Sequence, residues 1–128
     1  MAYVLDTNVA IHLRDGDPVT TDRIAELDDA ILISVVTRVE LEGGVQRYPA
    51  DTPVRQARLD AMLRAIPTLA FDDASADAYR GIVTRAGYSR RKLLDRMIAA
   101  QVLVHCATLV TMNPDDFADV TGLKIRVW

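Results

Sequence analysis

The segment YVLDTN at residues 3–8 joins three features that decide how the rest of the chain is interpreted. Residues 2–5 are an apolar run of strand length, and Asp6 follows that run directly. Asp6 or Thr7 can cap a helix, predicted over residues 9–13, which the turn-rich DGDP at residues 15–18 would end. A strand, an acid and a helix in immediate succession predict that Asp6 lies at the carboxyl end of a buried strand.

The remaining chain repeats this alternation of strands and helices. Thr20 or Thr21 would open a second helix and Thr37 a third, and Pro53 fits the first position of a fourth. Further helices are predicted over residues 73–86 and 93–106, with strands at residues 31–33, 68–71, 108–111 and 123–127. Alternating strands and helices predict an α/β fold with a central, mostly parallel sheet of four to five strands and helices on both faces. The length of 128 residues predicts a single domain, residues 1–128.

Composition narrows the classes of function. A net charge of −3 argues against a protein that coats nucleic acid by bulk electrostatics. No signal peptide is visible and the longest apolar region is too short to span a bilayer, so we expect a cytoplasmic protein with no membrane partner. The single cysteine, Cys106, excludes an internal disulfide or a cysteine-based zinc site, and its apolar neighbours predict a buried structural thiol.

Four separated segments carry acids that this fold would bring together. They are Asp6, Glu40, Asp95 and the segment NPDDF at residues 113–117, which follows a strand. Ligands of open parallel sheets bind at the carboxyl ends of the strands. Clustered carboxylates are costly without a cation, and their oxygens suit Mg²⁺ or Mn²⁺. The pattern predicts a metal site for phosphodiester hydrolysis.

Each acid also has a simpler explanation. TRVE at residues 37–40 fits a capping box, in which Glu40 only reaches back to the backbone of Thr37. Asp95 equally suits the N-terminal turn of a helix, where the dipole favours an anion. A basic strip close to Asp95 could hold a phosphate backbone or could simply be a solvated helix face; it comprises Arg80, Arg85, Arg90, Arg91, Lys92 and Arg96.

The ordered motifs resemble those of PIN-domain ribonucleases, and among them the VapC toxins of bacterial toxin–antitoxin pairs. They are VLDTN at residues 4–8, SVVTRVEL at 34–41, LDRMIAA at 94–100 and LVTMNPDDF at 109–117. The resemblance covers essentially the whole chain. It implies a three-layer α/β/α PIN-like fold and an endoribonuclease that depends on Mg²⁺, with Mn²⁺ possible. It also implies a structured RNA substrate such as transfer or ribosomal RNA, a VapB-like antitoxin and a homodimer.

The resemblance also implies roles for individual residues. Asp6 and Asp95 would bind the metal, and Glu40 would bind it or orient the attacking water. Asp116, in preference to Asp115, would complete the site. Three residues would hydrogen-bond the acids or add a neutral oxygen, namely Thr7, Thr111 and Asn113, and three would contact the RNA backbone, namely Arg90, Arg91 and Lys92.

Other functions fit the residues less well. A receiver-type signalling domain needs a lysine after its fifth strand. No lysine directly follows the late strand predicted at residues 108–111. A phosphatase with an aspartate nucleophile usually has a second aspartate two residues later, where this chain has Asn8. A PIN-fold RNA-processing nuclease without a toxin role, and a non-catalytic scaffold that binds RNA or a partner, are the alternatives that the sequence leaves open.

Overall fold

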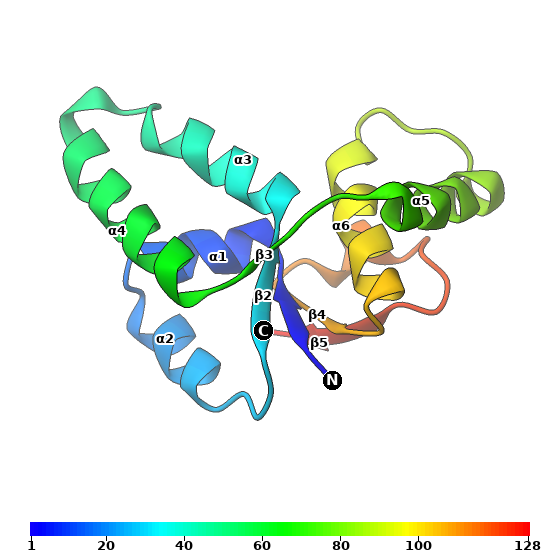
Figure 1. The fold of residues 1–128 in the computed structure, drawn as a ribbon, viewed down its shortest axis with the longest axis horizontal. Helices are drawn as coiled ribbons and strands as arrows, with labels where there is room; N and C mark the ends of the chain where they lie inside the picture. The colour runs from blue at the N-terminus through cyan, green and yellow to red at the C-terminus, as the bar shows by residue number, and fades with distance from the viewer.

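A computed structural model describes all 128 residues as a three-layer α/β/α fold around one five-stranded sheet (Figure 1). The strands are β1 (Tyr3–Leu5), β2 (Ile31–Ser34), β3 (Thr68–Leu69), β4 (Thr108–Thr111) and β5 (Lys124–Val127). Their order is β3-β2-β1-β4-β5 and every neighbouring pair is parallel. The predicted fold class is therefore confirmed, with a sheet that is entirely parallel. The strand order reverses between β1 and β4.

Helices cover both faces of this sheet. The helices are α1 (Thr7–Arg14), α2 (Pro18–Ala25), α3 (Val35–Val45), α4 (Thr52–Ala65), α5 (Asp73–Ala86) and α6 (Leu93–Val104), with short 3₁₀ turns η1 (Pro49–Asp51) and η2 (Pro114–Phe117). In Figure 1, α1, α2 and α4 lie on one side of the strands, and α5 and α6 lie on the other. None of the helices is both long enough and apolar enough to cross a lipid bilayer.

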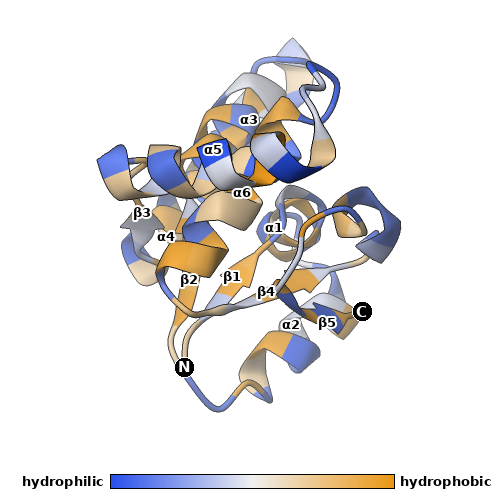
Figure 2. Cartoon of the chain, turned by 90° about the vertical axis from the view of Figure 1, so that its right-hand side faces the viewer, coloured by the Kyte–Doolittle hydropathy of each residue, from blue (hydrophilic) through white to orange (hydrophobic).

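Two hydrophobic clusters hold the layers together, one on each face. Successive strand residues point to opposite faces, so Leu5 packs into one cluster and Val4 into the other. The Leu5 cluster joins the sheet to α1, α3 and α4, and the Val4 cluster joins it to α5 and α6. Figure 2 shows the central strands β1 and β2 in the orange of hydrophobic residues, as strands covered on both faces require.

The predicted cap of the first helix, Asp6, is confirmed, whereas the second and third helices are capped by earlier residues than predicted. Asp6 caps α1, which begins at Thr7, and Asp17 caps α2, which begins at Pro18. Ser34 caps α3 by accepting a hydrogen bond from the Val36 backbone N–H at 2.9 Å. Thr37 therefore lies inside α3, and the capping box proposed for residues 37–40 does not form.

The predicted burial of Cys106 was also wrong. Helix α6 ends at Val104, two residues earlier than expected, and the chain then turns toward β4. Cys106 takes part in this turn with a left-handed φ of 50° and is exposed. In a turn that follows the end of a helix, few neighbouring residues cover the side chains, even when those side chains are apolar.

A buried polar network fixes α6 against the sheet. The Ser34 hydroxyl donates a hydrogen bond to Oε1 of Gln101, which is fully buried on α6. The Gln101 side-chain amide donates to the carbonyls of Leu69 and Ala70, each at 3.0 Å. The network joins the carboxyl ends of β2 and β3 to the helix that carries Asp95, and it satisfies groups that would be costly to bury unpaired.

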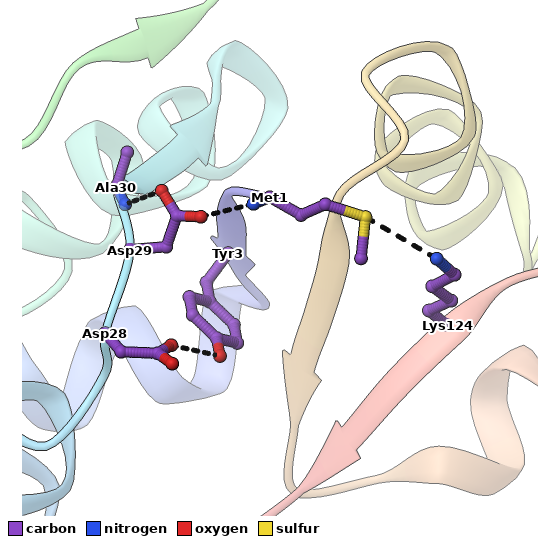
Figure 3. A network of polar contacts seen from close by, with 6 residues as sticks. All are labelled: Met1, Tyr3, Asp28, Asp29, Ala30 and Lys124. Carbon is purple, nitrogen blue, oxygen red and sulfur yellow. Dashed lines mark hydrogen bonds and ion pairs between the residues drawn. The ribbon is translucent and has the colours of Figure 1, made fainter.

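A second polar network lies at the amino ends of the strands (Figure 3). The Met1 ammonium group pairs with Asp29, which also accepts a hydrogen bond from the Ala30 N–H at 2.7 Å. The Tyr3 hydroxyl donates to Asp28 at 2.9 Å. These contacts tie the start of β1 to the loop before β2, at the sheet edge opposite the predicted acids.

Candidate functional site

All four predicted acids line one groove of about 580 Å³ at the carboxyl edge of the sheet. Asp6 follows β1, Glu40 lies on α3, Asp95 lies in the first turn of α6 and Asp116 lies in η2. The groove lies at the point where the strand order reverses, where open parallel sheets bind their ligands. The fold thus brings together four carboxylates that come from four separate parts of the chain.

Asp6 is the most firmly held of these acids. Its side chain is buried, and its residue is only 5% exposed. One carboxylate oxygen accepts a hydrogen bond from the Thr7 backbone N–H at 2.8 Å, and the other accepts one from the Thr111 hydroxyl at 2.8 Å. The Thr111 hydroxyl in turn accepts from the Asn113 N–H at 3.0 Å. Burial raises the pKa of Asp6, against the lowering effect of the two hydrogen bonds.

Thr7 links Asp6 to the neighbouring acid on α3. The Thr7 hydroxyl donates a hydrogen bond to Oε1 of Glu40 at 2.8 Å, and it lies 3.0 Å from the hydroxyl of Thr37. Glu40 itself is exposed on the groove side of α3. Thr7 and Thr111 therefore contact the acids directly, whereas Asn113 contributes its backbone N–H and its side chain is exposed.

The four acids influence one another electrostatically. Burial, followed by the negative charges of Asp6, Asp116 and Glu40, raises the pKa of Asp95 to about 6, and Lys92 opposes the rise. A cation would offset both the cost of burying this carboxylate and its repulsion by the other acids. No three of these side chains are close enough to enclose a metal ion. Such an open arrangement suits Mg²⁺, which takes one or two carboxylates and keeps several waters.

We expect Asp95→Asn to raise the melting temperature of the metal-free protein at pH 7.5. The folded pKa of Asp95 lies above the ordinary value of 3.8, so its stabilising contribution is present below that value and is lost as the pH rises through about 6. Asparagine has no charge to lose, so the advantage of the variant should narrow at pH 4.5. Thermal unfolding in EDTA at both pH values measures the effect. Asp22→Asn, on the exposed side of α2, is the control, and an equal gain at both pH values would contradict the prediction.

Two predicted RNA contacts, Arg91 and Lys92, lie beside the acids. They line an adjoining hollow of about 410 Å³ together with Asp95, Asp115 and Asp116. Lys92 also forms an ion pair with Asp119 at 3.1 Å. Arg90, the residue before Arg91, is exposed but does not line this hollow.

The basic strip is not one continuous surface, contrary to its simplest interpretation. Arg96 is only 2% exposed, because it turns inward and donates hydrogen bonds to Asp119 at 2.6 Å and to the Gly87 carbonyl at 2.7 Å. Arg80 pairs with Asp77 at 3.7 Å on α5. Arg96 therefore serves the packing of α6 and is not available to a phosphate backbone.

Sequence reasoning missed Arg47, which lines the groove with the acids. Glu40, Gly44 and Arg47 are spaced by four and three residues, so they lie on one face along α3 and its C-terminal end. If Glu40 is a site residue, that spacing predicts that Arg47 lies along the same groove. Gly43 and Gly44 also line the groove, and their lack of side chains leaves it open between Glu40 and Arg47.

A larger hollow of about 810 Å³ lies apart from the acids, between α1, α2 and α4. Its lining is mostly apolar and includes Leu13, Ile24, Met62 and Ile66, with Arg14 and Arg58 among the few charged residues. It contains none of the predicted site residues.

The fold and the groove define an α/β protein with an acidic site at its switch point. The model of the PIN domain family matches residues 3–123, and the chain belongs to this family. It is 28% identical to Ribonuclease VapC2 of Rickettsia felis over 135 residues, an alignment that covers 100% of this chain and 98% of that protein.

Solved structures agree with this assignment. The chain is similar to DNA-bound VapBC of Salmonella typhimurium, with a TM-score of 0.86, 24% identity, and coverage of 100% of this chain and 98% of that one. It is also similar to VapBC-5 of Mycobacterium tuberculosis, a member of the VapBC family of toxin–antitoxin systems. That match has a TM-score of 0.71 and 28% identity, and it covers 98% of this chain and 96% of the other.

Proposed function

We propose that this protein is a Mg²⁺-dependent endoribonuclease, the toxin of a toxin–antitoxin module, which cleaves structured RNA such as transfer or ribosomal RNA in the cytoplasm. The observation that supports this most strongly is the groove that Asp6, Glu40, Asp95 and Asp116 line together. The likeness to Ribonuclease VapC2 supports the choice of RNA as substrate. Mn²⁺ would suit the same oxygen ligands.

In this proposal each acid has a distinct task. Asp6 and Asp95 would hold the metal, Glu40 would hold it or orient the attacking water, and Asp116 would complete the site. A bound Mg²⁺ makes water more acidic and offsets the negative charge that builds up on the phosphate. Thr7 and Thr111 keep the carboxylates of Glu40 and Asp6 in position through the hydrogen bonds described above.

The basic residues at the start of α6 would bind the RNA backbone in this proposal. Arg91 and Lys92 share a hollow with Asp95 and Asp116, so a phosphate held there would be next to the acids. Arg90 would extend the contact outward along the backbone. Positive groups that position phosphates without reading bases are the usual source of nucleic-acid affinity.

The proposed partner is a VapB-like antitoxin. A groove with four carboxylates would attract an arginine of a partner segment, which could then block the RNA site. The apolar hollow between α1, α2 and α4 would accept an apolar helix from the same partner. We further propose a homodimer, as the resemblance to VapC toxins implies.

The first experiment is the cleavage of purified total RNA by the isolated protein in Mg²⁺ and in EDTA. We expect discrete fragments in Mg²⁺ only. We also expect Mg²⁺ to raise the melting temperature, since an ion at 100 times its dissociation constant stabilises the fold by about 2.7 kcal/mol. Sodium chloride at matched ionic strength is the control. A melting shift without cleavage of any RNA in the pool would favour the non-catalytic scaffold, and cleavage in EDTA would contradict the metal dependence.

A further inference from the structure

Three side chains form a cationic and aromatic cluster at the turn between α3 and α4. Arg47 and Tyr48 lie in the turn just after α3, and Arg55 lies near the start of α4. The guanidinium carbon of Arg47 is 5.8 Å from the centroid of the Tyr48 ring, and that of Arg55 is 5.2 Å from the same centroid. One exposed ring thus has two guanidinium groups within about 6 Å of its centroid.

No acid neutralises this cluster. The ion pairs of the protein engage other cations, and neither Arg47 nor Arg55 has a carboxylate within 4.0 Å. Tyr48 is 53% exposed. In a chain with a net charge of −3, two unpaired arginines around an exposed aromatic ring are a local surface suited to a flexible, negatively charged ligand that has planar groups.

The cluster adjoins the acidic groove. Arg47 lines the groove with the four acids, seven residues after Glu40, which places it roughly 10 Å further along the axis of α3. Arg91 and Lys92 lie beside Asp95 and Asp116, in the neighbouring hollow. In Figure 1 the turn after α3 and the loop before α6 lie at opposite ends of the upper side of the molecule. Positive groups therefore lie beside the carboxylates in both the groove and the adjoining hollow.

We propose that Arg47, Tyr48 and Arg55 form an RNA subsite for an unpaired nucleotide next to the cleaved phosphate. Arg47 and Arg55 bind phosphates of the strand, and the base stacks on the Tyr48 ring in place of one of the two guanidinium groups. This inference rests on the proposed ribonuclease function and adds to it a selection for single-stranded segments, because a base in a helix has no free face to offer. An acidic protein segment could pair with the arginines, but it would leave the exposed ring without a role.

The test measures RNA binding and cleavage separately. The probe for binding is a single-stranded 12-nucleotide RNA that contains 2-aminopurine and a terminal fluorescein, with the Asp6→Asn protein as a background that leaves the probe intact. We expect Tyr48→Ala to weaken binding about 10-fold and to abolish the quenching of 2-aminopurine, and Tyr48→Phe to retain both. Arg55→Ala should reduce the salt dependence of binding by about one phosphate contact.

Two control positions lie on α4, the helix that carries Arg55. Val54→Ala changes an exposed neighbour of Arg55, and Arg64→Ala removes an exposed arginine near the other end of α4. Both should bind the probe as the parent protein does. In the cleavage-competent protein, Tyr48→Ala should raise KM and leave kcat nearly unchanged, because stacking beside the cleavage position stabilises substrate and transition state alike.

The outcomes distinguish this subsite from the nuclease activity. If the natural protein cleaves RNA and Tyr48→Ala binds and cleaves equally well, the subsite is wrong and the nuclease stands. If the probe binds in a Tyr48-dependent way but no RNA is cleaved, the subsite stands without the nuclease. If Tyr48→Ala changes the sedimentation coefficient, or weakens binding only of a labelled glutamate-rich peptide, the cluster is a protein contact and the proposal is overturned.

Discussion

Asp6→Asn should lower the rate of RNA cleavage roughly 10³-fold, because the loss of a metal ligand removes several kcal/mol of transition-state stabilisation. Among the four acids, Asp6 is the most buried, and both of its oxygens are already oriented by hydrogen bonds at 2.8 Å. Asparagine has nearly the same shape but presents only one oxygen and no charge. The measurement is the initial rate on an RNA that the natural protein cleaves in Mg²⁺.

The fold should survive this substitution. The amide oxygen of asparagine can still accept the hydrogen bond from the Thr7 N–H that caps α1, and the amide nitrogen can donate to the Thr111 hydroxyl. Asp17→Asn is the control, since Asp17 caps α2 outside the groove by accepting from the Thr20 N–H, and it should leave the rate unchanged. A folded Asp6→Asn protein with normal turnover would remove Asp6 from the proposed mechanism.

Arg96→Met should lower the free energy of unfolding by about 3 kcal/mol, which for a chain of this size is a fall in melting temperature of roughly 10 °C. Arg96 is buried, and it joins α6 to Asp119 and to the Gly87 carbonyl after α5. Methionine fills much of the same volume but leaves the Asp119 carboxylate without its closest partner. Urea denaturation monitored by circular dichroism measures the change.

Two comparisons separate the lost ion pair from lost packing. Asp119→Leu in the Arg96→Met background should recover part of the stability, since it removes the carboxylate that has lost its closest partner and keeps only Lys92. Arg80→Met breaks an exposed pair with Asp77 and should cost less than about 1 kcal/mol. Arg96 and Lys92 hold the pKa of Asp119 below its ordinary value of 3.8, so the stability that they contribute is present above that pH and is lost as the pH falls below it. Equal losses for Arg96→Met and Arg80→Met would contradict the prediction.

The parts of the fold that follow from local pattern were predictable from the sequence. Short apolar runs, each followed by a capping residue and a helix, predict parallel strands whose carboxyl ends share one edge. That rule alone brings Asp6 and the segment after β4 together, and it places Glu40 on the helix that leaves β2. Asp6 and Asp116 could be found because their positions follow from strand ends, whereas Asp95, on a helix that follows another helix, was indicated by its motif and the family resemblance.

The details that failed depend on tertiary contacts. Nothing local distinguishes Arg96, which turns inward to Asp119, from Arg91, which faces the hollow beside the acids. Ser34 caps α3 while its hydroxyl also serves Gln101, sixty-seven residues away in the chain. Cys106 lies among apolar residues in sequence but in a turn in space. For Arg96 and Ser34 a partner distant in sequence decides the outcome, whereas Cys106 is exposed because α6 ends two residues before it.

The position of β1 in the sheet has a consequence for how the protein is made. β1 is synthesised first, yet it lies between β2 and β4, and the Asp6 N–H donates to the carbonyl of Val110 at 2.9 Å. Chains grow from the N-terminus at about 5–20 residues per second, so Asp6 waits several seconds for Thr111 and Asp116. A protein synthesised in this order has no complete acidic groove until most of its chain has been translated.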